Sequence, residues 1–414
     1  MKSKTFCIYP FVSIVTEPNG DLGICCRSRK VDNVTNSSLL DAWNNDIMKH
    51  LRLDLLAGEK PSICNGCWRD EDIGIGSKRT RNNNMQNPNS ENANFFGQEE
   101  LMLSDGTMPI PPQHIEFRVN NLCNLKCRMC NPLDSTSWDD WDSVKEMVKK
   151  YNPEVSNRIE ILNLENKPLL DQYNDSFYND IQTAVPFLKK VDFSGGEPLT
   201  NPKHYQIIDM LMSRASEIEL KYDTNFLNLY FKKTSVFDTW KHFKSVQLNV
   251  STDGIGDVYD YVRSNGSYTT LKENLDLIVG QSNVTQLVLS SATSIYNVHD
   301  MPNVTRLAAS YGAPHHMCKV SYPNFLSCQI LPDSEKKPLT DNLTEFINEI
   351  PSIYQDQELA QYVISQYYDL ITFLNVPLYT GEIIKDFIKY DTALNESRKT
   401  NRIAVVTRLA ELAI

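Results

Sequence analysis

Residues 114–322 alternate between two hydrophobic periods, and this alternation restricts the fold more than any other feature of the 414-residue chain. Short segments in which apolar and polar residues alternate, as in strands, are followed by segments with helical spacing. The expected strands are 114–120, 189–195, 218–224, 245–252, 285–293 and 315–322. A helix is expected between the first two strands, at DSTSWDDWDSVKEMVKKY (134–151), with Asp134 or Ser135 as its cap. Strands that alternate with helices predict an α/β fold with a parallel sheet and right-handed crossovers. Periodicity alone fits both a partial or full barrel and an open doubly wound sheet.

The remaining sequence predicts three further regions. Residues 82–99 are rich in Asn and lack apolar periodicity, which is typical of a linker. The segments after residue 335 all have helical spacing. We therefore expect a small N-terminal unit at 1–81, a linker at 82–112, the α/β region at 113–330 and a helical C-terminal region at 331–414.

The composition of the chain argues against several classes of protein. A formal net charge of −11 argues against a nucleic-acid surface, which is usually basic. The chain has no run of 18 apolar residues, so we expect no membrane span. Its N-terminus lacks the small-residue cleavage site of a signal peptide. Ten cysteines without an export signal indicate a cytoplasmic protein whose clustered cysteines bind metal or do redox work.

Three of these cysteines, Cys123, Cys127 and Cys130, form a C-x3-C-x2-C motif directly after the first expected strand. Ligands gather at the carboxyl ends of parallel strands, and thiolates bind soft metals and iron–sulfur clusters. Three thiolates are one ligand fewer than a closed tetrahedral site needs, and an open position is typical of catalytic metal sites. A structural zinc site completed by a distant His or Cys is the alternative.

Three more motifs follow expected strands at the same edge: SGGEP (194–198), DTNF (223–226) and STDG (251–254), with Arg263 ten residues beyond Asp253. Paired glycines allow a close backbone approach, a glutamate can receive an ammonium group, and an arginine can pair with a carboxylate. Each motif alone is also typical of a capping turn. Their order on one edge makes the combination specific.

With these motifs the sequence resembles the radical SAM superfamily. The resemblance implies a partial (β/α)6 TIM-type barrel. It also implies a [4Fe–4S] cluster on the three cysteines whose fourth iron binds S-adenosylmethionine, and a 5′-deoxyadenosyl radical that abstracts hydrogen from a substrate. A reductant such as flavodoxin or ferredoxin is implied as a partner. No catalytic acid or base is assigned. Met129 stands where the family often has an aromatic residue, and its soft side chain can pack on an adenine. The implied cofactor contacts are Met129, Gly195, Gly196, Glu197, Thr224, Asn225, Ser251, Asp253 and Arg263.

A second cysteine set lies near the N-terminus: Cys7, Cys25, Cys64 and Cys67. The Asn-Gly pair of EPNGDL (17–22) predicts a hairpin between the first two, and a helix capped at Ser37 or Ser38 leads to the other two. Two separated thiolate pairs can close a zinc ribbon.

The same stretch resembles a twitch domain, the half-length form of the SPASM domain. This resemblance implies an auxiliary [4Fe–4S] cluster, the second in the chain, which accepts an electron. Cys26 is the alternative ligand to Cys25. Such a domain commonly follows the barrel, whereas here it precedes it.

The substrate stays open at this stage. The resemblance favours a peptide or protein side chain, and a small molecule such as an alcohol is the alternative. A non-catalytic zinc or iron–sulfur protein is an alternative of another class. For Cys318 and Cys328 we expect ordinary buried positions.

Overall fold

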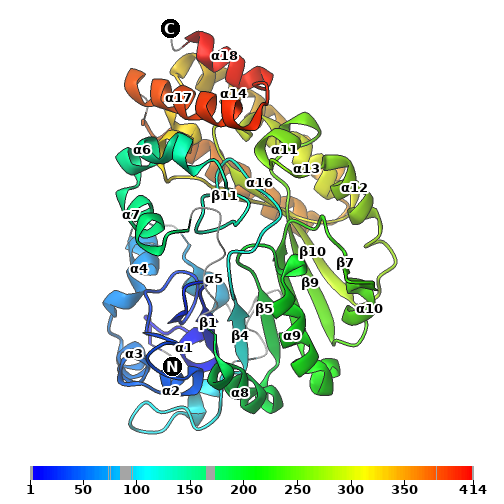
Figure 1. The fold of residues 1–414 in the computed structure, drawn as a ribbon. Helices are drawn as coiled ribbons and strands as arrows, with labels where there is room; N and C mark the ends of the chain where they lie inside the picture. The colour runs from blue at the N-terminus through cyan, green and yellow to red at the C-terminus, as the bar shows by residue number, and fades with distance from the viewer. Residues whose placement is uncertain are drawn as a thin grey trace.

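The computed structural model of the protein describes residues 3–72, 74, 76–83, 95, 97–164, 173–378 and 380–412. Its centre is a nine-stranded sheet with the order β11-β10-β9-β6-β5-β4-β1-β2-β3, of which Figure 1 labels β1, β4, β5, β9, β10 and β11. The strands are β1 Ser13–Thr16, β2 Asp21–Gly23, β3 Asp32–Asn33, β4 His114–Phe117, β5 Lys190–Phe193, β6 Glu219–Thr224, β9 Ser245–Ser251, β10 Val284–Thr293 and β11 His315–Lys319. A separate hairpin joins β7 (Tyr230–Phe231) to β8 (Thr234–Ser235).

The six strands expected from the sequence are present, and neighbours pair in parallel from β4 to β11. One face is apolar: Ile115, Val191, Leu220 and Val246 lie in register and are all fully buried. The α/β class with a parallel sheet is therefore confirmed. Since β11 and β3 are the edges of the described sheet, closure into a partial barrel stays a prediction.

The N-terminal region continues this sheet, which the sequence did not predict. The expected hairpin is present, because β1 and β2 pair antiparallel around Gly20, which has a φ of +81°. However, β1 also pairs in parallel with β4, with Ser13 opposite His114. Phe11 and Trp43 share one buried core with Ile115. The boundaries at 81 and 112 stay predictions, and residues 84–94 and 96 of the expected linker lie outside the described residues.

Helices lie beside the sheet and beyond its ends (Figure 1). The expected helix after the three cysteines begins at Trp141, later than the predicted caps Asp134 and Ser135. Its predicted start was wrong because the Ser135 hydroxyl donates to the Leu125 carbonyl oxygen at 2.5 Å. The helices from the N-terminus to β11 are α1 Tyr9–Val12, α2 Leu39–Trp43, α3 Asp46–Ala57, α4 Asn65–Asp72, α5 Lys78–Asn82, α6 Trp141–Tyr151, α7 Pro153–Leu162, α8 Asp175–Ala184, α9 Pro202–Leu211, α10 Val236–Trp240, α11 Asp257–Val262, α12 Tyr268–Asp276 and α13 Met301–Ser310.

The C-terminal region is helical, as expected: α14 Asp333–Ile347, α15 Ile350–Ile353, α16 Gln357–Leu374, α17 Gly381–Arg398 and α18 Ala404–Leu412. Figure 1 places α14, α17 and α18 at the opposite end of the molecule from the N-terminus. They form a second buried core, in which Trp138 and Tyr296 of the α/β region meet Phe387 of α17. The C-terminal helices are therefore packed into the α/β region.

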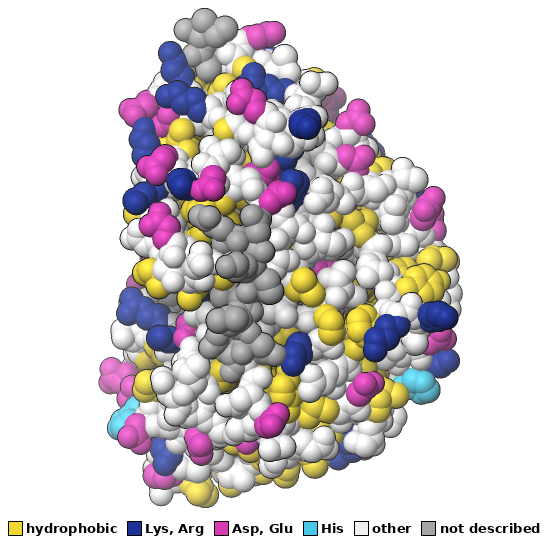
Figure 2. All heavy atoms as spheres, viewed as in Figure 1, with side chains coloured by type: hydrophobic (Ala, Val, Ile, Leu, Met, Phe, Trp, Pro, Cys, Tyr) yellow, Lys and Arg dark blue, Asp and Glu magenta, His cyan; other side chains and the backbone are white. Residues whose placement is uncertain are grey.

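Two surface properties bear on partners. None of the described helices combines the length and the apolar character that a membrane crossing requires. On the face drawn in Figure 2, acidic and basic side chains are interspersed over the described residues. The net negative charge is thus not gathered into one patch on that face.

Candidate functional site

The loop after β4, residues 118–137 and here called the cysteine loop, carries the three cysteines at the carboxyl end of the sheet. Its backbone is anchored to the turn that ends α11. The Lys126 N–H donates to the Ser264 carbonyl oxygen at 3.0 Å, and the Arg128 N–H donates to the Val262 carbonyl oxygen at 2.9 Å. The loop position therefore depends on the fourth strand–helix unit as well as on β4.

The three cysteine thiols lie close together. All three are free, Cys127 is buried, and Cys123 and Cys130 are half-buried. A hydrogen bond with Cys130 lowers the pKa of Cys127, while burial and the neighbouring Cys127 raise the pKa of Cys123 to about 12. Three soft donors that influence one another fit an iron–sulfur cluster. Within the described residues no group of His, Cys, Asp and Glu already has the geometry of a formed metal site, so ligation by these cysteines stays a prediction.

Gly195 and Gly196 allow the second strand end to lie against the cysteine loop. A Cβ atom on Gly196 would lie 2.3 Å from the Leu122 carbonyl oxygen, and Gly195 has a φ of +108°. The Glu197 N–H donates to the same Leu122 oxygen at 2.7 Å. The predicted close approach is thus present, but its partner in the structure is the backbone beside Cys123.

Glu197 brings the second and third strand ends together. Its buried carboxylate accepts hydrogen bonds from the Asn225 N–H at 2.6 Å, the Thr224 hydroxyl at 2.7 Å and the Leu199 N–H at 3.0 Å. Burial raises the pKa of Glu197, against the lowering effect of the Asn225 N–H. The Asn225 side chain also donates to Asn124 of the cysteine loop at 2.8 Å. Sequence reasoning missed Asn124, which has no motif of its own.

The fourth strand end contributes a buried ion pair. Arg263 contacts Asp253 at 2.6 Å, and Asp253 also accepts a 2.7 Å hydrogen bond from the Ala292 N–H. Burial would lower the pKa of Arg263, but Cys127 and Asp253 outweigh it and raise the pKa. The buried Nε of Arg263 has no hydrogen bond of normal geometry among the described residues. This free donor beside Cys127 fits the predicted cofactor carboxylate.

The remaining two predicted contacts are more peripheral. Ser251 is half-buried at the end of β9. Met129 is half-buried and packs against the C-terminal core. The structure therefore joins seven of the nine predicted cofactor residues to the cysteine loop or to one another, while Met129 is a residue of that loop and Ser251 lies at the end of β9. These seven are Gly195, Gly196, Glu197, Thr224, Asn225, Asp253 and Arg263.

The N-terminal cysteines also converge from separate elements. Cys7 precedes α1, Cys25 follows β2, Cys64 ends a short 3₁₀ turn and Cys67 lies in α4. Burial, followed by the charge of Cys25, raises the pKa of Cys7, and Cys64 and Cys67 act in the same direction. Cys26 is exposed and lies 3.3 Å from the Lys78 ammonium. This arrangement favours Cys25 over Cys26 as the fourth ligand.

Residues 7–68 match the SPASM family, described as an iron–sulfur cluster-binding domain. The match includes all four N-terminal cysteines. It confirms the expected SPASM-like domain ahead of β4. It also favours an iron–sulfur cluster over zinc at this site.

Solved structures similar to the chain include SuiB of Streptococcus suis bound to S-adenosylmethionine, at 11% identity and a TM-score of 0.33 over 57% of this chain and 48% of that one. A second is anSMEcpe with bound AdoMet and the Cp18Cys peptide, at 13% identity, a TM-score of 0.35, and 58% and 60% coverage. A third is TYW1 with a lysine-pyruvate adduct, at 14% identity, a TM-score of 0.29, and 57% and 72% coverage. The chain thus spans about half the length of SuiB, and these scores carry no conclusion about its reaction. No curated protein matches the chain.

The face of the sheet opposite the apolar row is polar. Glu116, Asp192, Lys221 and Gln247 lie in register across four strands. Nearer the carboxyl ends, Asn249 donates to Asp223 at 2.7 Å and accepts a 2.5 Å hydrogen bond from the Ser290 hydroxyl. The exposed Cys318, expected to be buried, lies on β11 of the same sheet, while Cys328 is buried as expected.

Proposed function

We propose that the protein is a radical SAM enzyme with an auxiliary iron–sulfur cluster in its N-terminal domain. The observation that carries the proposal is the convergence of three cysteines with Glu197, Asn225 and Arg263 at one edge of a parallel sheet. The SPASM match supports the second cluster independently. When bound, a cluster and S-adenosylmethionine together supply the 5′-deoxyadenosyl radical by reductive cleavage.

In this proposal the chain binds and orients the cofactor. Cys123, Cys127 and Cys130 hold the cluster and leave one iron open. Glu197 attracts the ammonium group, because a buried carboxylate gains strongly from a cationic partner. The free Nε of Arg263 donates to the carboxylate of the cofactor. The four N-terminal cysteines have no open position, so their cluster would accept an electron from the substrate radical.

We propose a peptide or protein side chain as the substrate, because SPASM-type domains are frequent in peptide-modifying members of the superfamily. The polar sheet face suits either a peptide backbone or a hydroxylated small molecule. Asp223 and Asn249 favour the hydroxylated small molecule as the second candidate substrate, since a carboxylate and an amide together bind hydroxyl groups well. The net charge of −11 argues against nucleic acid, and no membrane partner is proposed.

Iron and sulfide analysis after anaerobic reconstitution tests the two-cluster proposal. We expect about eight iron atoms per chain, because each [4Fe–4S] cluster holds four. The double variants Cys127→Ala/Cys130→Ala and Cys64→Ala/Cys67→Ala should each keep about four. Cys318→Ala, the matched control at an exposed cysteine, should keep the full content. A full content in the Cys127→Ala/Cys130→Ala variant would remove the proposed cluster from the cysteine loop.

The substrate candidates are separated by deuterium transfer. Two sets of deuterated compounds would be offered to the reconstituted enzyme. The first set is peptides encoded by short genes beside this one, and the second set is small polyols. Deuterium in 5′-deoxyadenosine from peptide samples alone supports the first candidate, and deuterium from polyols alone supports the second.

A further inference from the structure

We propose that Arg128 and helix α17 form a clamp that holds the cysteine loop in its metal-binding shape before any cluster is present. The inference rests on the proposed function for the identity of the metal group. Arg128 lies between Cys127 and Met129, so its side chain and the flanking cysteines share one short stretch of backbone.

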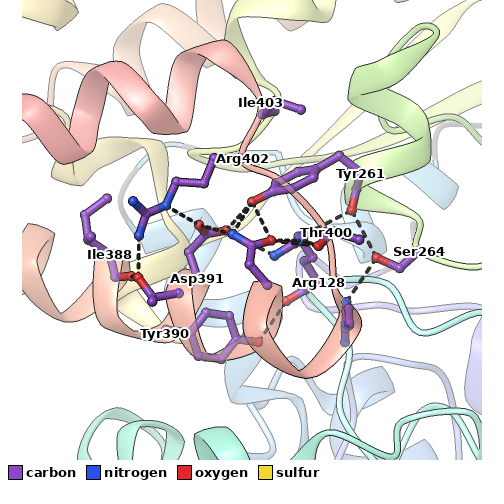
Figure 3. A network of polar contacts seen from close by, with 12 residues as sticks. Arg128, Tyr261, Ser264, Ile388, Tyr390, Asp391, Thr400, Arg402 and Ile403 are labelled. Carbon is purple, nitrogen blue, oxygen red and sulfur yellow. Dashed lines mark hydrogen bonds and ion pairs between the residues drawn. The ribbon is translucent and has the colours of Figure 1, made fainter.

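Each nitrogen of the Arg128 guanidinium has a hydrogen-bond partner, as Figure 3 shows. Nε donates to the Tyr261 carbonyl oxygen at 2.9 Å, and one terminal nitrogen contacts the Asp391 carboxylate at 3.1 Å. The other terminal nitrogen donates to Asn395 at 2.6 Å and to the Thr400 hydroxyl at 3.1 Å. Arg128 and Asp391 are both fully buried. A planar guanidinium with a partner at each of its three nitrogens is held in one orientation.

The partners of Arg128 are themselves fixed by further contacts. Asp391 accepts hydrogen bonds from the Tyr261 hydroxyl at 2.6 Å and the Asn395 side chain at 2.8 Å, and it pairs with Arg402 at 3.1 Å. The guanidinium lies 3.5 Å from the centre of the Tyr261 ring. The network thus joins α11, α17 and the turn after α17 around one side chain (Figure 3).

The backbone of the loop is held as well as the side chain. The Tyr390 hydroxyl of α17 donates to the Arg128 carbonyl oxygen at 2.9 Å, and the Arg128 N–H is bonded to Val262. Farther along α17, Arg398 pairs with Asp140 at 2.8 Å and donates to the Ser264 hydroxyl at 3.1 Å. Ser264 is the residue whose carbonyl oxygen anchors Lys126. Helix α17 therefore holds the backbone on both sides of Cys127, directly at Arg128 and through Ser264 at Lys126.

The position of Arg128 between Cys127 and Met129 distinguishes this network from an ordinary buried ion pair. Removing one partner of a buried pair leaves an uncompensated charge, and here that charge is Arg128 itself. To regain water, Arg128 must pull the backbone of its neighbours out of the core. Residues that orient metal ligands typically change metal affinity about 10- to 100-fold when they are replaced. Asp391 is thus a positioning residue for Cys127 and Cys130.

Helix α17 supplies a matched control. Asp386, also buried, pairs with Lys150 at 2.5 Å and accepts a 2.8 Å hydrogen bond from the Tyr151 hydroxyl. It thus has a cation and a tyrosine hydroxyl, as Asp391 does, but these two partners belong to α6, and its further ion pair, at 3.4 Å, is with Lys389 of α17. Asp386→Asn weakens the contact between α17 and α6 without changing a partner of Arg128. Asp391→Asn, in contrast, removes the negative charge that faces Arg128.

Hydrogen exchange of the metal-free, full-length protein tests the clamp independently of cofactor chemistry. We expect Asp391→Asn to speed amide exchange of residues 121–131 at least about tenfold, and Asp386→Asn to leave it unchanged. Arg128→Lys, which keeps the charge but loses the planar fork, should give a smaller increase in the same segment. Circular dichroism checks that each variant is folded, and Arg128→Lys carries the test if Asp391→Asn is not. Equal exchange of this segment in the folded clamp variants, the control and the wild type would overturn the proposal.

Iron release to a chelator then links the clamp to the metal. The Asp391→Asn protein should lose the cysteine-loop iron about 10-fold faster than the Asp386→Asn protein, with a changed electron paramagnetic resonance signal. Faster amide exchange with equal iron release would overturn the link to the metal. If the wild type binds no iron at the cysteine loop while Asp391→Asn still speeds exchange, the proposed function fails and the clamp stands as a structural device.

Discussion

Gly196→Ala should displace the cysteine loop. The new Cβ would lie 2.3 Å from the Leu122 carbonyl oxygen, 2.7 Å from the Leu122 carbonyl carbon and 2.8 Å from the Asn121 carbonyl carbon. All three atoms belong to the backbone, so no side chain can rotate away. Non-bonded atoms approach to about 3.5 Å, so the backbone at Gly196 and the backbone of the cysteine loop at 121–122 must separate by about 1 Å.

The expected cost follows from two contributions. Overpacking a close-packed site costs about 1–3 kcal/mol. Separation also weakens the 2.7 Å hydrogen bond from the Glu197 N–H to Leu122, which is worth about 1 kcal/mol. We therefore expect the free energy of unfolding to fall by about 2–4 kcal/mol, and a 1 Å displacement near a reacting centre to lower activity about 100-fold.

Urea unfolding of the metal-free protein under anaerobic conditions measures the first quantity. Gly381→Ala is the control, because a Cβ at Gly381 meets nothing within 4 Å, and it should stay within about 0.5 kcal/mol of the wild type. If Gly196→Ala is as stable as Gly381→Ala, then Gly196 does not hold the cysteine loop in the way described.

Three further predictions follow from buried groups. Asp253→Asn leaves Arg263 buried without its partner and should lower the free energy of unfolding in urea by about 3–5 kcal/mol. The control Asp276→Asn, at an exposed carboxylate, should lower it by less than about 1 kcal/mol. Equal costs would contradict the buried ion pair of Asp253 and Arg263. Glu197→Gln puts an amide where Thr224 and Asn225 donate to a carboxylate and should weaken S-adenosylmethionine binding at least about tenfold in equilibrium dialysis, so unchanged binding would exclude Glu197 as a cofactor contact. Burial lowers the pKa of both His204 and His315 to about 3; the unfolded chain therefore binds more protons between pH 3 and 6.5, and the free energy of unfolding should fall by about 1.4 kcal/mol per pH unit per histidine below pH 6.5. The double variant His204→Gln/His315→Gln should show a shallower decline in urea unfolding at pH 7, 6 and 5, and an unchanged slope would show that these histidines do not titrate as expected.

The sequence predicted those parts of the molecule that depend on local pattern. Alternation of apolar and polar residues located the six parallel strands, because one face of each strand must be buried. The short buried segment Ser13–Thr16 gave no sign that it pairs with His114–Phe117 about a hundred residues away. The start of α6 was misplaced because Ser135 bonds to Leu125 instead of capping a helix.

The residues of the site also divide into those that a local sequence pattern predicts and those that it does not. Glu197 and Asn225 were predicted because each lies in a short motif after a strand, and Arg263 because it lies ten residues beyond Asp253 of a third motif. Arg128 and Asp391, which are 263 residues apart in the chain, carry no motif. The one available signal for Arg128 was a charged residue between Cys127 and Cys130 of the motif, and no local pattern identifies Asp391 as its partner.

In the proposed function, the three cysteines of the loop hold a cluster that cleaves S-adenosylmethionine. The direct measurement is the formation of 5′-deoxyadenosine by the anaerobically reconstituted protein with dithionite, compared with the Cys127→Ala variant. We expect 5′-deoxyadenosine from the wild type and none above background from the variant. A wild-type protein with its full iron and sulfide content that forms no 5′-deoxyadenosine would contradict it.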